Sequence, residues 1–230
     1  MPHWPTSRAE LVAVQDALAR SNPPPWEPPR HGRTGACFVC FQRGGEGPGA
    51  EGDSAWAGAV AMSERGTEAS AVVEGEAAAP YEASLLALRE GALLEAVVRE
   101  LAEPPDVLLV DATGRDHPRR AGLALHLGAV VEIPTVGVTH RTLVAAGEWP
   151  RDEPGERSPL TIGTDLVGYW LQTRHGTRPL AVHAAWRTDA ETAVEVVLGA
   201  LRGARTPEPL REARRLARSA RAAAGPAGRR

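Results

Sequence analysis

The chain has 230 residues, a length that suits one domain of ordinary size. Apolar residues make up 43% of it and charged residues 24%, which allows a sizeable core and excludes wholesale disorder. The 26 basic residues, all of them Arg, are outnumbered by 29 acidic residues, and the formal net charge of -3 excludes a histone-like polycation. No run approaches the roughly 18–20 apolar residues of a membrane span and no signal pattern opens the chain, so we expect a cytoplasmic protein without membrane contact.

The first 34 residues predict a helix followed by an extended strap. Leu11, Val14 and Leu18 have helical spacing within Arg8–Arg20, and the Pro-rich stretch that follows favours a strap along the surface. Three apolar runs come next, and they predict an antiparallel meander of strands over 35–41, 55–63 and 68–74.

Both cysteines of the chain lie in the first of these strands. Cys37 and Cys40 are three residues apart, so a strand places them on opposite faces. A single pair of cysteines is half of a four-cysteine zinc site. We therefore expect two buried apolar residues, with a redox pair as the alternative.

The second half of the chain predicts helices alternating with strands. A broad apolar stripe over Ala83–Leu101 indicates a helix that ends at Pro104-Pro105. The remaining helices are expected over 119–127, 189–202 and 209–224, and the remaining strands over 106–110, 130–138, 165–173 and 179–185. A meander followed by this alternation predicts one α/β domain with a mixed sheet. We divide the chain into 1–34, the α/β body over 35–205, and an Arg-rich helix and tail over 206–230 of the same domain.

The C-terminal segment is strongly basic. Residues 202–230 hold nine Arg against Glu208 and Glu212. Two interpretations remain open: a solvated amphipathic helix with a frayed tail, or a patch that faces phosphate groups.

The most informative stretch is DVLLVDATGRDHPRR, residues 106–120. Asp111 follows an apolar strand and precedes a turn, which is where α/β sheets place their ligands. A carboxylate there can hold Mg²⁺, and the Arg residues of the turn can hold phosphate oxygens. The alternative is that Asp111 caps the turn and Asp116 caps the following helix.

This stretch resembles the endonuclease V family, whose pattern is a hydrophobic strand, Asp, Gly-x-Gly, two residues and His-Pro-Arg-Arg. Here Asp111 is followed by Ala112-Thr113-Gly114, Arg115-Asp116 and His117-Pro118-Arg119-Arg120. Three further segments resemble the family in the same order: AGLALHLG after the turn, IPTVGV at 133–138, and PYEASLLALRE at 80–90.

The resemblance covers about residues 35–205 and implies a ribonuclease H-like sheet. It also implies a Mg²⁺-dependent endonuclease, with Mn²⁺ able to substitute, that hydrolyses a phosphodiester near inosine or another deaminated base. The implied role is DNA repair, the implied partner is DNA or RNA, and we expect a monomer. The alternative is a weakened or inactive member that binds nucleic acid without efficient cleavage.

Residue by residue, the resemblance implies that Asp111 and Glu90 are catalytic metal ligands and that His117 belongs to the catalytic site. Tyr81 matches the tyrosine of the family's strand-separating wedge. The nucleic-acid patch that it implies consists of Tyr81, Arg119, Arg120, His140, Arg141, Trp186 and Arg187. The bland alternatives are a turn-packing imidazole for His117 and a surface aromatic for Tyr81.

The chain departs from the family pattern at several places. The Asp of the first strand falls on Cys37 or Phe38, neither of which is a carboxylate ligand, and Asp53 in the following loop is the alternative donor. The His of Gly-His-Arg has become Trp186, which we expect near the site mouth, stacking on a base or blocking it. The last metal carboxylate falls on Asp189 or Glu191.

Overall fold

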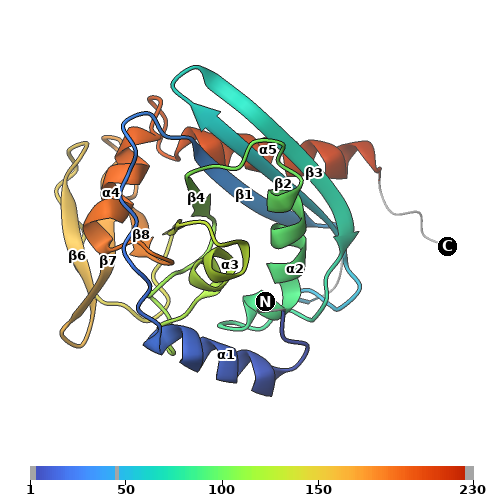
Figure 1. The fold of residues 1–230 in the computed structure, drawn as a ribbon. Coiled ribbons are helices and arrows are strands. Elements are labelled where there is room, and N and C mark those ends of the chain that lie inside the picture. Colours follow the sequence, from blue (N-terminus) through green and yellow to red (C-terminus); the bar gives the residue numbers. More distant parts are fainter. Residues whose placement is uncertain (1–3, 45–46, 226–230) are drawn as a thin grey trace.

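The computed structural model describes residues 4–44 and 47–225 and contains one eight-stranded mixed sheet (Figure 1). The strand order is β3-β2-β1-β4-β5-β8-β7-β6, with β1, β4 and β5 parallel to one another and the other pairs antiparallel. The strands are β1 Thr34–Phe41, β2 Ser54–Ser63, β3 Gly66–Glu76, β4 Val107–Val110, β5 Thr135–Thr139, β6 Arg157–Ile162, β7 Asp165–Leu171 and β8 Leu180–Ala184. The predicted meander, β1 to β3, is confirmed.

Helices cover both faces of the sheet. They are α1 Arg8–Arg20, α2 Leu86–Arg99, α3 Leu123–Val131, α4 Ala190–Gly199 and α5 Glu208–Ala223. One core cluster joins α2 and α3 to the face of the sheet that carries Cys37 and Val110. A second cluster joins α4 and α5 to the face that carries Leu109. Because residues alternate between faces, the short strand β4, buried at all four positions, contributes to both cores.

Two predicted boundaries are wrong because single residues adopt left-handed backbone conformations. Ser84 has φ 65°, so α2 begins at Leu86 and not at Ala83. Arg120 has φ 56°, so residues 113–122 form a turn and α3 begins at Leu123. The helix then extends to Val131, so the strand predicted over Val130–Val138 is confirmed only in its second half, beyond Pro134.

Strand β6 was missed by the sequence patterns. Its sequence begins Arg157-Ser158-Pro159 and shows no clear apolar alternation. It lies at the edge of the sheet, where it pairs with β7 and forms one isolated bridge from Thr161 to Ala146, and at such an edge proline and charged residues are tolerated.

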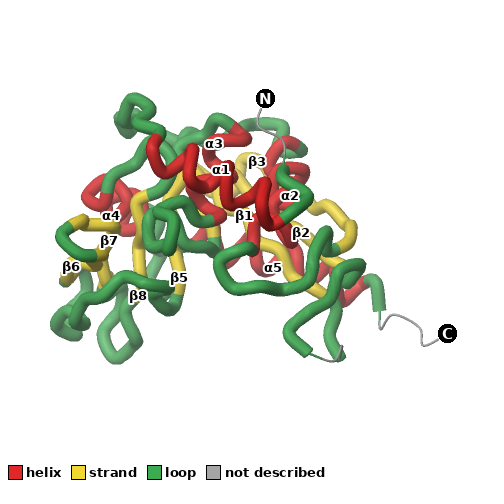
Figure 2. The backbone as a smooth tube through the Cα atoms, turned by 90° about the horizontal axis from the view of Figure 1, so that it is seen from below, coloured by secondary structure: helices red, strands yellow, loops and turns green. Residues whose placement is uncertain are grey.

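The N-terminal segment packs on the α/β body. Helix α1 is as predicted and contacts α2 and α3, across which it lies in Figure 2. The Pro-rich strap is fixed further along: Trp26 N–H donates to the Arg187 carbonyl (2.8 Å), and Arg187 Nε donates to the Pro24 carbonyl (3.0 Å). The strap therefore lies against the segment that follows β8 and is held there by hydrogen bonds.

Helix α5 lies directly against β1 and β2, behind the sheet in Figure 1. Gly58 on β2 makes this close approach possible. A Cβ atom there would meet the Ala213 carbonyl oxygen at 2.6 Å and the Ala217 nitrogen at 2.9 Å, which is closer than side chains normally come. Helix α5 is therefore packed on the sheet, and this contact determines where its arginines lie.

The cysteines are free and buried, and they lie on opposite faces of β1 as predicted. Cys37 belongs to the core beneath α2 and α3, whereas Cys40 packs with Trp56 and Ala217 on the α5 side. Their positions exclude a bond between them in this fold.

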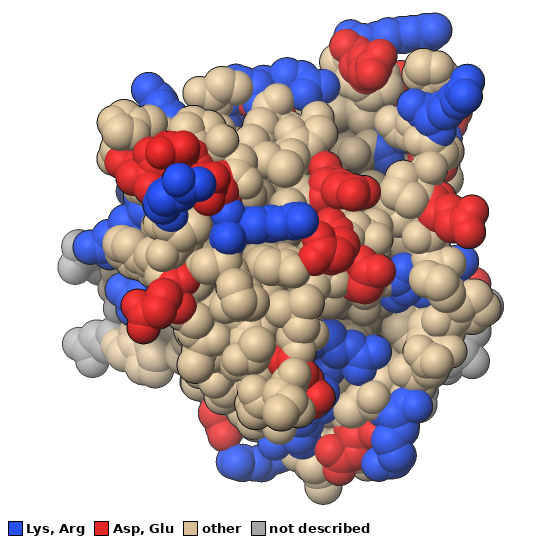
Figure 3. Space-filling view, turned by 90° about the vertical axis from the view of Figure 1, so that its left-hand side faces the viewer, with Lys and Arg blue, Asp and Glu red and all other residues tan. Residues whose placement is uncertain are grey.

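Two features bear on a membrane span and on a basic binding face: the length and apolarity of the helices, and the charges on one face of the surface. Within the described residues, no helix is long and apolar enough to cross a bilayer. On the face that shows the β6–β7 edge, Arg and acidic side chains are interspersed over a mostly uncharged surface (Figure 3). This face has no continuous positive surface.

Candidate functional site

Asp111 stands at the carboxyl end of β4, between β1 and β5. Four buried apolar residues, Val107–Val110, hold the strand in the middle of the sheet, and the chain then leaves it at Asp111. The Asp111 side chain is 26% exposed, so the carboxylate opens on the surface at the end of a rigid element. Asp111 lies at the centre of the predicted site.

Cys37, and not Phe38, shares the buried environment of the carboxylates. Cys37 is in register with Val110 on the neighbouring parallel strand and is fully buried. Burial, and then the negative charges of Asp111 and Glu90, raise the pKa of its thiol. The thiol therefore stays protonated and uncharged near neutral pH. Phe38 packs with the core on the α4–α5 face.

Glu90 comes from α2 and faces Asp111. Burial raises its pKa to about 7, with a further contribution from Asp111 and an opposing one from Arg89. Within the described part of the chain, no hydrogen bond or ion pair reaches the Glu90 carboxylate. Near neutral pH this group is divided between its protonated and charged forms.

Asp53, the alternative donor, is bound elsewhere. Arg89 is nearly fully buried, and its Nη2 lies 2.7 Å from Asp53 Oδ2. Arg89 Nη1 also donates to the carbonyls of Ala50 and Ala79, and its guanidinium lies 4.0 Å from the ring centre of Phe41. This network locks the loop after β1 and leaves Asp53 out of the site.

Arg214 of α5 forms an ion pair with Asp111. Its Nη2 lies 2.9 Å from Asp111 Oδ2, and its side chain is only 15% exposed. Its guanidinium and that of Arg218, one turn later, lie 5.6 and 5.5 Å from the ring centre of Phe38. Sequence reasoning missed this contact, because no local spacing relates residue 214 to residue 111.

The turn after Asp111 is held by its own buried polar side chains. Asp116 is fully buried, and its oxygens accept the backbone N–H groups of Leu143, Val144 and Ala145 at 2.7–2.8 Å. It therefore anchors the loop after β5, and it does not cap α3. The adjacent His183 is also fully buried, and burial lowers its pKa to about 4.

His117 lies in this turn and uses both ring nitrogens within the protein. Nδ1 accepts the N–H of Arg119 (3.2 Å), which leaves Nε2 to donate to the Ser84 carbonyl (3.0 Å). Burial lowers its pKa, so the imidazole is neutral. His117 thus connects the turn to the segment before α2, and its ring has no nitrogen left for a ligand.

A cavity of about 160 Å³ lies beside Asp111. Tyr81, which is 46% exposed, lies at the rim of this cavity. The chain bends around the cavity at Ser84, which has a positive φ. The remaining wall is largely apolar and comes from four other parts of the chain, including Gln15, Leu86, Ala112, Thr113, His117, Leu123 and Leu143. Three of the predicted residues, Asp111, Tyr81 and His117, therefore meet at one hollow.

The two expected α4 carboxylates do not join this site. Asp189 caps α4, accepting the N–H of Thr192 at 2.7 Å. Glu191 accepts the Tyr169 hydroxyl and pairs with Arg157 at 2.8 Å, on β7 and β6. Three strand spacings, about 14 Å, separate β4 from β7. The prediction of a metal ligand at either position is wrong.

Trp186 and Arg187 also lie away from Asp111. The backbone of Trp186 bonds with Thr135 at the start of β5, and its side chain packs over Gly128 of α3. Thr135 is in register with Leu108, at the far end of β4 from Asp111. The Trp186 side chain is therefore partly buried against the core beneath α2 and α3, away from Asp111, and Arg187 holds the strap.

The remaining predicted cations divide into two groups. Arg119 donates to Gln15 (2.6 Å), and Arg120 donates to the Ile162 carbonyl and to Asp165 (3.0 Å each), so both bind neighbouring segments. His140 and Arg141 are exposed at the end of β5. The pKa of His140 is lowered by burial and by Arg205 and Arg214, whereas Asp111 raises it, so His140 stays within the electrostatic reach of the site.

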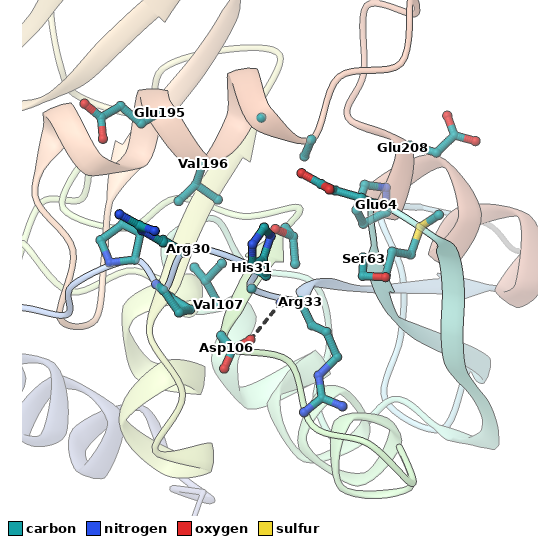
Figure 4. A pocket seen from close by; sticks show the side chains of 18 of the residues that line it. Arg30, His31, Arg33, Ser63, Glu64, Asp106, Val107, Glu195, Val196 and Glu208 are labelled. Carbon is teal, nitrogen blue, oxygen red and sulfur yellow. Dashed lines mark hydrogen bonds between the residues drawn. The ribbon is translucent and has the colours of Figure 1, made fainter.

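A larger cavity, about 560 Å³, lies at the opposite end of β1 and β4 (Figure 4). Arg30 and His31 of the strap line it together with Glu195 of α4 and Glu208 of α5. Asp106 accepts the backbone N–H of Arg33 there (2.7 Å), which fixes the strap to the start of β4. Its lining mixes charges of both signs, and Asp111 is not part of it.

The fold and the site together define a class: ribonuclease H-like α/β proteins with acidic residues at the carboxyl end of the central parallel strands. The family model described as Endonuclease V matches residues 48–215, beginning beyond β1. The endonuclease V of Streptomyces avermitilis is 34% identical over 221 residues, covering 94% of this chain and 93% of that protein. The chain belongs to the endonuclease V family, whose members are nucleases acting on inosine-containing nucleic acid.

Solved structures agree with this assignment. The crystal structure of the Streptomyces avermitilis endonuclease V has a TM-score of 0.85 at 34% identity and covers 97% of each chain. A Ciona intestinalis endonuclease V, bound to a DNA 23-mer containing an inosine, has a TM-score of 0.75 at 23% identity. It covers 94% of this chain and 97% of that one, and at this identity it shows the shared fold alone.

The family is typically magnesium-dependent, and the residues of this chain do not fit such an ion. Mg²⁺ prefers carboxylate and other hard oxygen ligands. Here Cys37 offers a neutral thiol, and Asp111 is already paired with a guanidinium. Across residues 4–44 and 47–225, no three His, Cys, Asp or Glu side chains form a group that could hold a metal ion.

Proposed function

We propose that this protein recognises inosine, or another deaminated base, in a DNA or RNA strand by receiving the base in the cavity beside Asp111. The observation that carries this proposal is that cavity: about 160 Å³, largely apolar and bordered by the half-exposed Tyr81. Its volume suits one base rather than a length of strand. Enzymes that act at a base remove it from the stack into a close-fitting pocket.

The surroundings of the cavity favour a preformed site. Asp116 fixes the loop that carries Leu143, and His117 fixes the turn to Ser84, so two opposite walls are tied by buried hydrogen bonds. A rigid pocket loses little entropy when a base enters it. Tyr81 offers a ring face for stacking, worth about 1–3 kcal/mol per base in other proteins.

We further propose that cleavage by this chain is slow compared with that of relatives having a carboxylate in the first strand. The family pattern has Asp where Cys37 lies, and a buried neutral thiol supplies no negative charge there. The Arg214–Asp111 ion pair supports a second candidate, a family member that binds nucleic acid without efficient cleavage.

The test is an assay on inosine-containing single- and double-stranded DNA and RNA, with Mg²⁺ or Mn²⁺. Strands with guanosine in place of inosine, the Asp111→Ala variant and the Streptomyces avermitilis enzyme serve as controls. We expect tighter binding to inosine strands than to guanosine strands, and cleavage that Asp111→Ala abolishes and that is on the order of 10–100-fold slower than that of the relative. Equal binding to both strands would refute the recognition proposal. Cleavage as fast as the relative's would refute the slow-cleavage proposal.

A further inference from the structure

The Arg214 guanidinium is the cation paired with Asp111. It is 2.9 Å from Asp111 and mostly buried, and it comes from a helix whose backbone lies in contact with Gly58 of the sheet. A long Arg side chain at the surface normally samples many rotamers, whereas this one is enclosed and paired. Its position is therefore a built feature of the fold.

The site already holds one cation beside Asp111. Arg214 Nη2 lies 2.9 Å from Asp111 Oδ2, and Cys37, in register with Val110 on the strand next to β4, is a thiol and not a carboxylate. A metal ion entering this site would have to displace Arg214 and would gain no ligand from Cys37.

Arg218 extends the positive charge away from Asp111. It is one helical turn from Arg214, on the same face of α5, and both guanidinium groups lie near the Phe38 ring. Arg211 and Arg215 on the same helix are paired with Glu208 and Glu212. Among the described residues, no carboxylate lies within ion-pair distance of Arg218.

The open hollow along this face of α5 is lined by arginines. Arg211, Arg214, Arg215 and Arg218 border it together with Ser219, and its volume is about 510 Å³. A row of guanidinium groups is suited to bidentate contacts with phosphate oxygens. The hollow shares Arg214 with the carboxylate site, so a strand whose base enters the cavity beside Asp111 can continue past Arg218.

We infer that Arg214 takes the place at Asp111 that a divalent cation holds in a metal-dependent nuclease, and that Arg214 and Arg218 bind the strand's phosphates, so nucleic-acid binding needs no metal. This inference rests on the proposed function, because it concerns the same strand at the same site. It adds that the α5 arginines contribute to the affinity for the strand and that binding does not depend on divalent ions.

The test measures binding of a fluorescent single-stranded oligonucleotide by anisotropy, in EDTA and in Mg²⁺ at matched ionic strength. The parent, Arg214→Gln, Arg214→Lys and Arg151→Gln are compared with inosine and guanosine strands. Arg151→Gln is the matched control, since that residue also forms an ion pair, with Glu156, but does not line the hollow. Thermal melting by circular dichroism verifies that each variant is folded.

For the parent we expect the dissociation constant to change less than about twofold between EDTA and Mg²⁺, since matched salt leaves counterion release unchanged. Arg214→Gln should weaken binding about 10–100-fold in EDTA, because it loses a charged contact to phosphate. It should also lower the slope of log affinity against log salt by about one. Arg214→Lys keeps the charge without the planar fork and should fall between the two.

Two results would overturn the inference. One is parent binding that is lost in EDTA and restored by Mg²⁺. The other is an Arg214→Gln variant that binds as tightly as Arg151→Gln. The two strands separate this inference from the proposed function: equal affinity for inosine and guanosine strands refutes base recognition, while the effects of EDTA and of Arg214→Gln still decide the role of Arg214.

Discussion

The cavity and the carboxylate centre lie side by side, but this chain keeps the expected residues at the cavity and departs from the family pattern at the centre. Around the cavity, Asp116 and His117 place their polar atoms in buried hydrogen bonds, and the expected Tyr81 stands at the rim. At the centre, Cys37 is uncharged and Asp111 is neutralised by Arg214. On one side of the site the polar groups are paired within the protein, while on the other a thiol lies where the family pattern has Asp and an Arg pairs with Asp111. The comparison teaches that binding a base and hydrolysing its strand depend on separate sets of residues.

The largest effect is expected on the cavity side, at Asp116. Asp116→Ala removes a fully buried carboxylate that accepts three backbone N–H groups and should lower the free energy of unfolding by about 3–5 kcal/mol. Urea denaturation measures this loss. Asp165→Ala is the control, since Asp165 is an exposed carboxylate paired with Arg120, and it should cost less than about 1 kcal/mol. If both variants lose the same amount, Asp116 does not organise the cavity wall.

The next largest effect is expected at the centre, from restoring its charge pattern. Cys37→Asp combined with Arg214→Gln supplies a carboxylate and releases Asp111, so metal-dependent cleavage of inosine strands should rise on the order of 10–100-fold. Either substitution alone should give less, because the two groups act on the same carboxylate.

Cys37→Asn combined with Arg214→Gln is the matched control, because Asn has the shape of Asp without its charge. Single-turnover rates with the protein in saturating excess over a labelled strand measure the gain, so the weaker binding expected of Arg214→Gln does not enter the comparison. A double Asp variant that cleaves no faster than the Asn control would show that the first-strand charge does not limit the reaction.

Glu90 sharpens the comparison through pH. Its pKa is raised from 4.5 to about 7 in the folded state, so the folded protein binds a proton that the unfolded chain has released. As far as Glu90 is concerned, the free energy of unfolding should therefore be highest below pH 4.5 and should fall by about 3 kcal/mol as pH rises from 4.5 through about 7.

Denaturation of the parent and of Glu90→Gln between pH 4 and pH 8 tests this linkage. The Gln variant should have a flatter profile, while Glu100→Gln, an exposed residue at the end of α2, should follow the parent. Parallel profiles for all three proteins would mean that Glu90 does not titrate with a raised pKa.

The smallest effect is expected at the rim of the cavity. Tyr81→Ala should weaken binding of an inosine strand about tenfold, because a stacking surface is lost, and Tyr81→Phe should retain the parent affinity. Trp149→Ala, which removes an aromatic side chain that is 57% exposed elsewhere, serves as the control in the same anisotropy assay. Unchanged binding by Tyr81→Ala would remove Tyr81 from the recognition surface.

Much of the cavity side could be predicted from the sequence, because its residues lie in continuous motifs. The strand before Asp111, the His117 turn and the stretch from Tyr81 to Glu90 were each recognised by their order and spacing, and the structure brings them together. The mixed sheet followed from the alternation of apolar runs. Strand β6 was missed because an edge strand needs little apolar character.

The centre could not be predicted to the same degree, because its geometry depends on long-range packing. Glu191 has the right residue type near the right place in the chain, yet α4 directs it toward Tyr169 and Arg157. Arg214 lies in a segment whose pattern left a solvated helix and a phosphate patch both open. Only the packing of α5 on β1 and β2 determines which of its arginines reaches Asp111.

The absence of a side chain at Gly58 has a consequence for the conformational entropy of Arg214. An Arg side chain carries about 2 kcal/mol of rotamer entropy, and holding it in one place opposes the ion pair by a share of that amount. Because α5 rests on β2 backbone to backbone, the Cα atom of Arg214 is held as firmly as the sheet itself. Only the side-chain torsions remain to be ordered. A methyl group at position 58 would push α5 away from β2, and the helix axis could then move. Because the Arg214 side chain is long, a small movement of the axis would become a larger displacement of the guanidinium relative to Asp111.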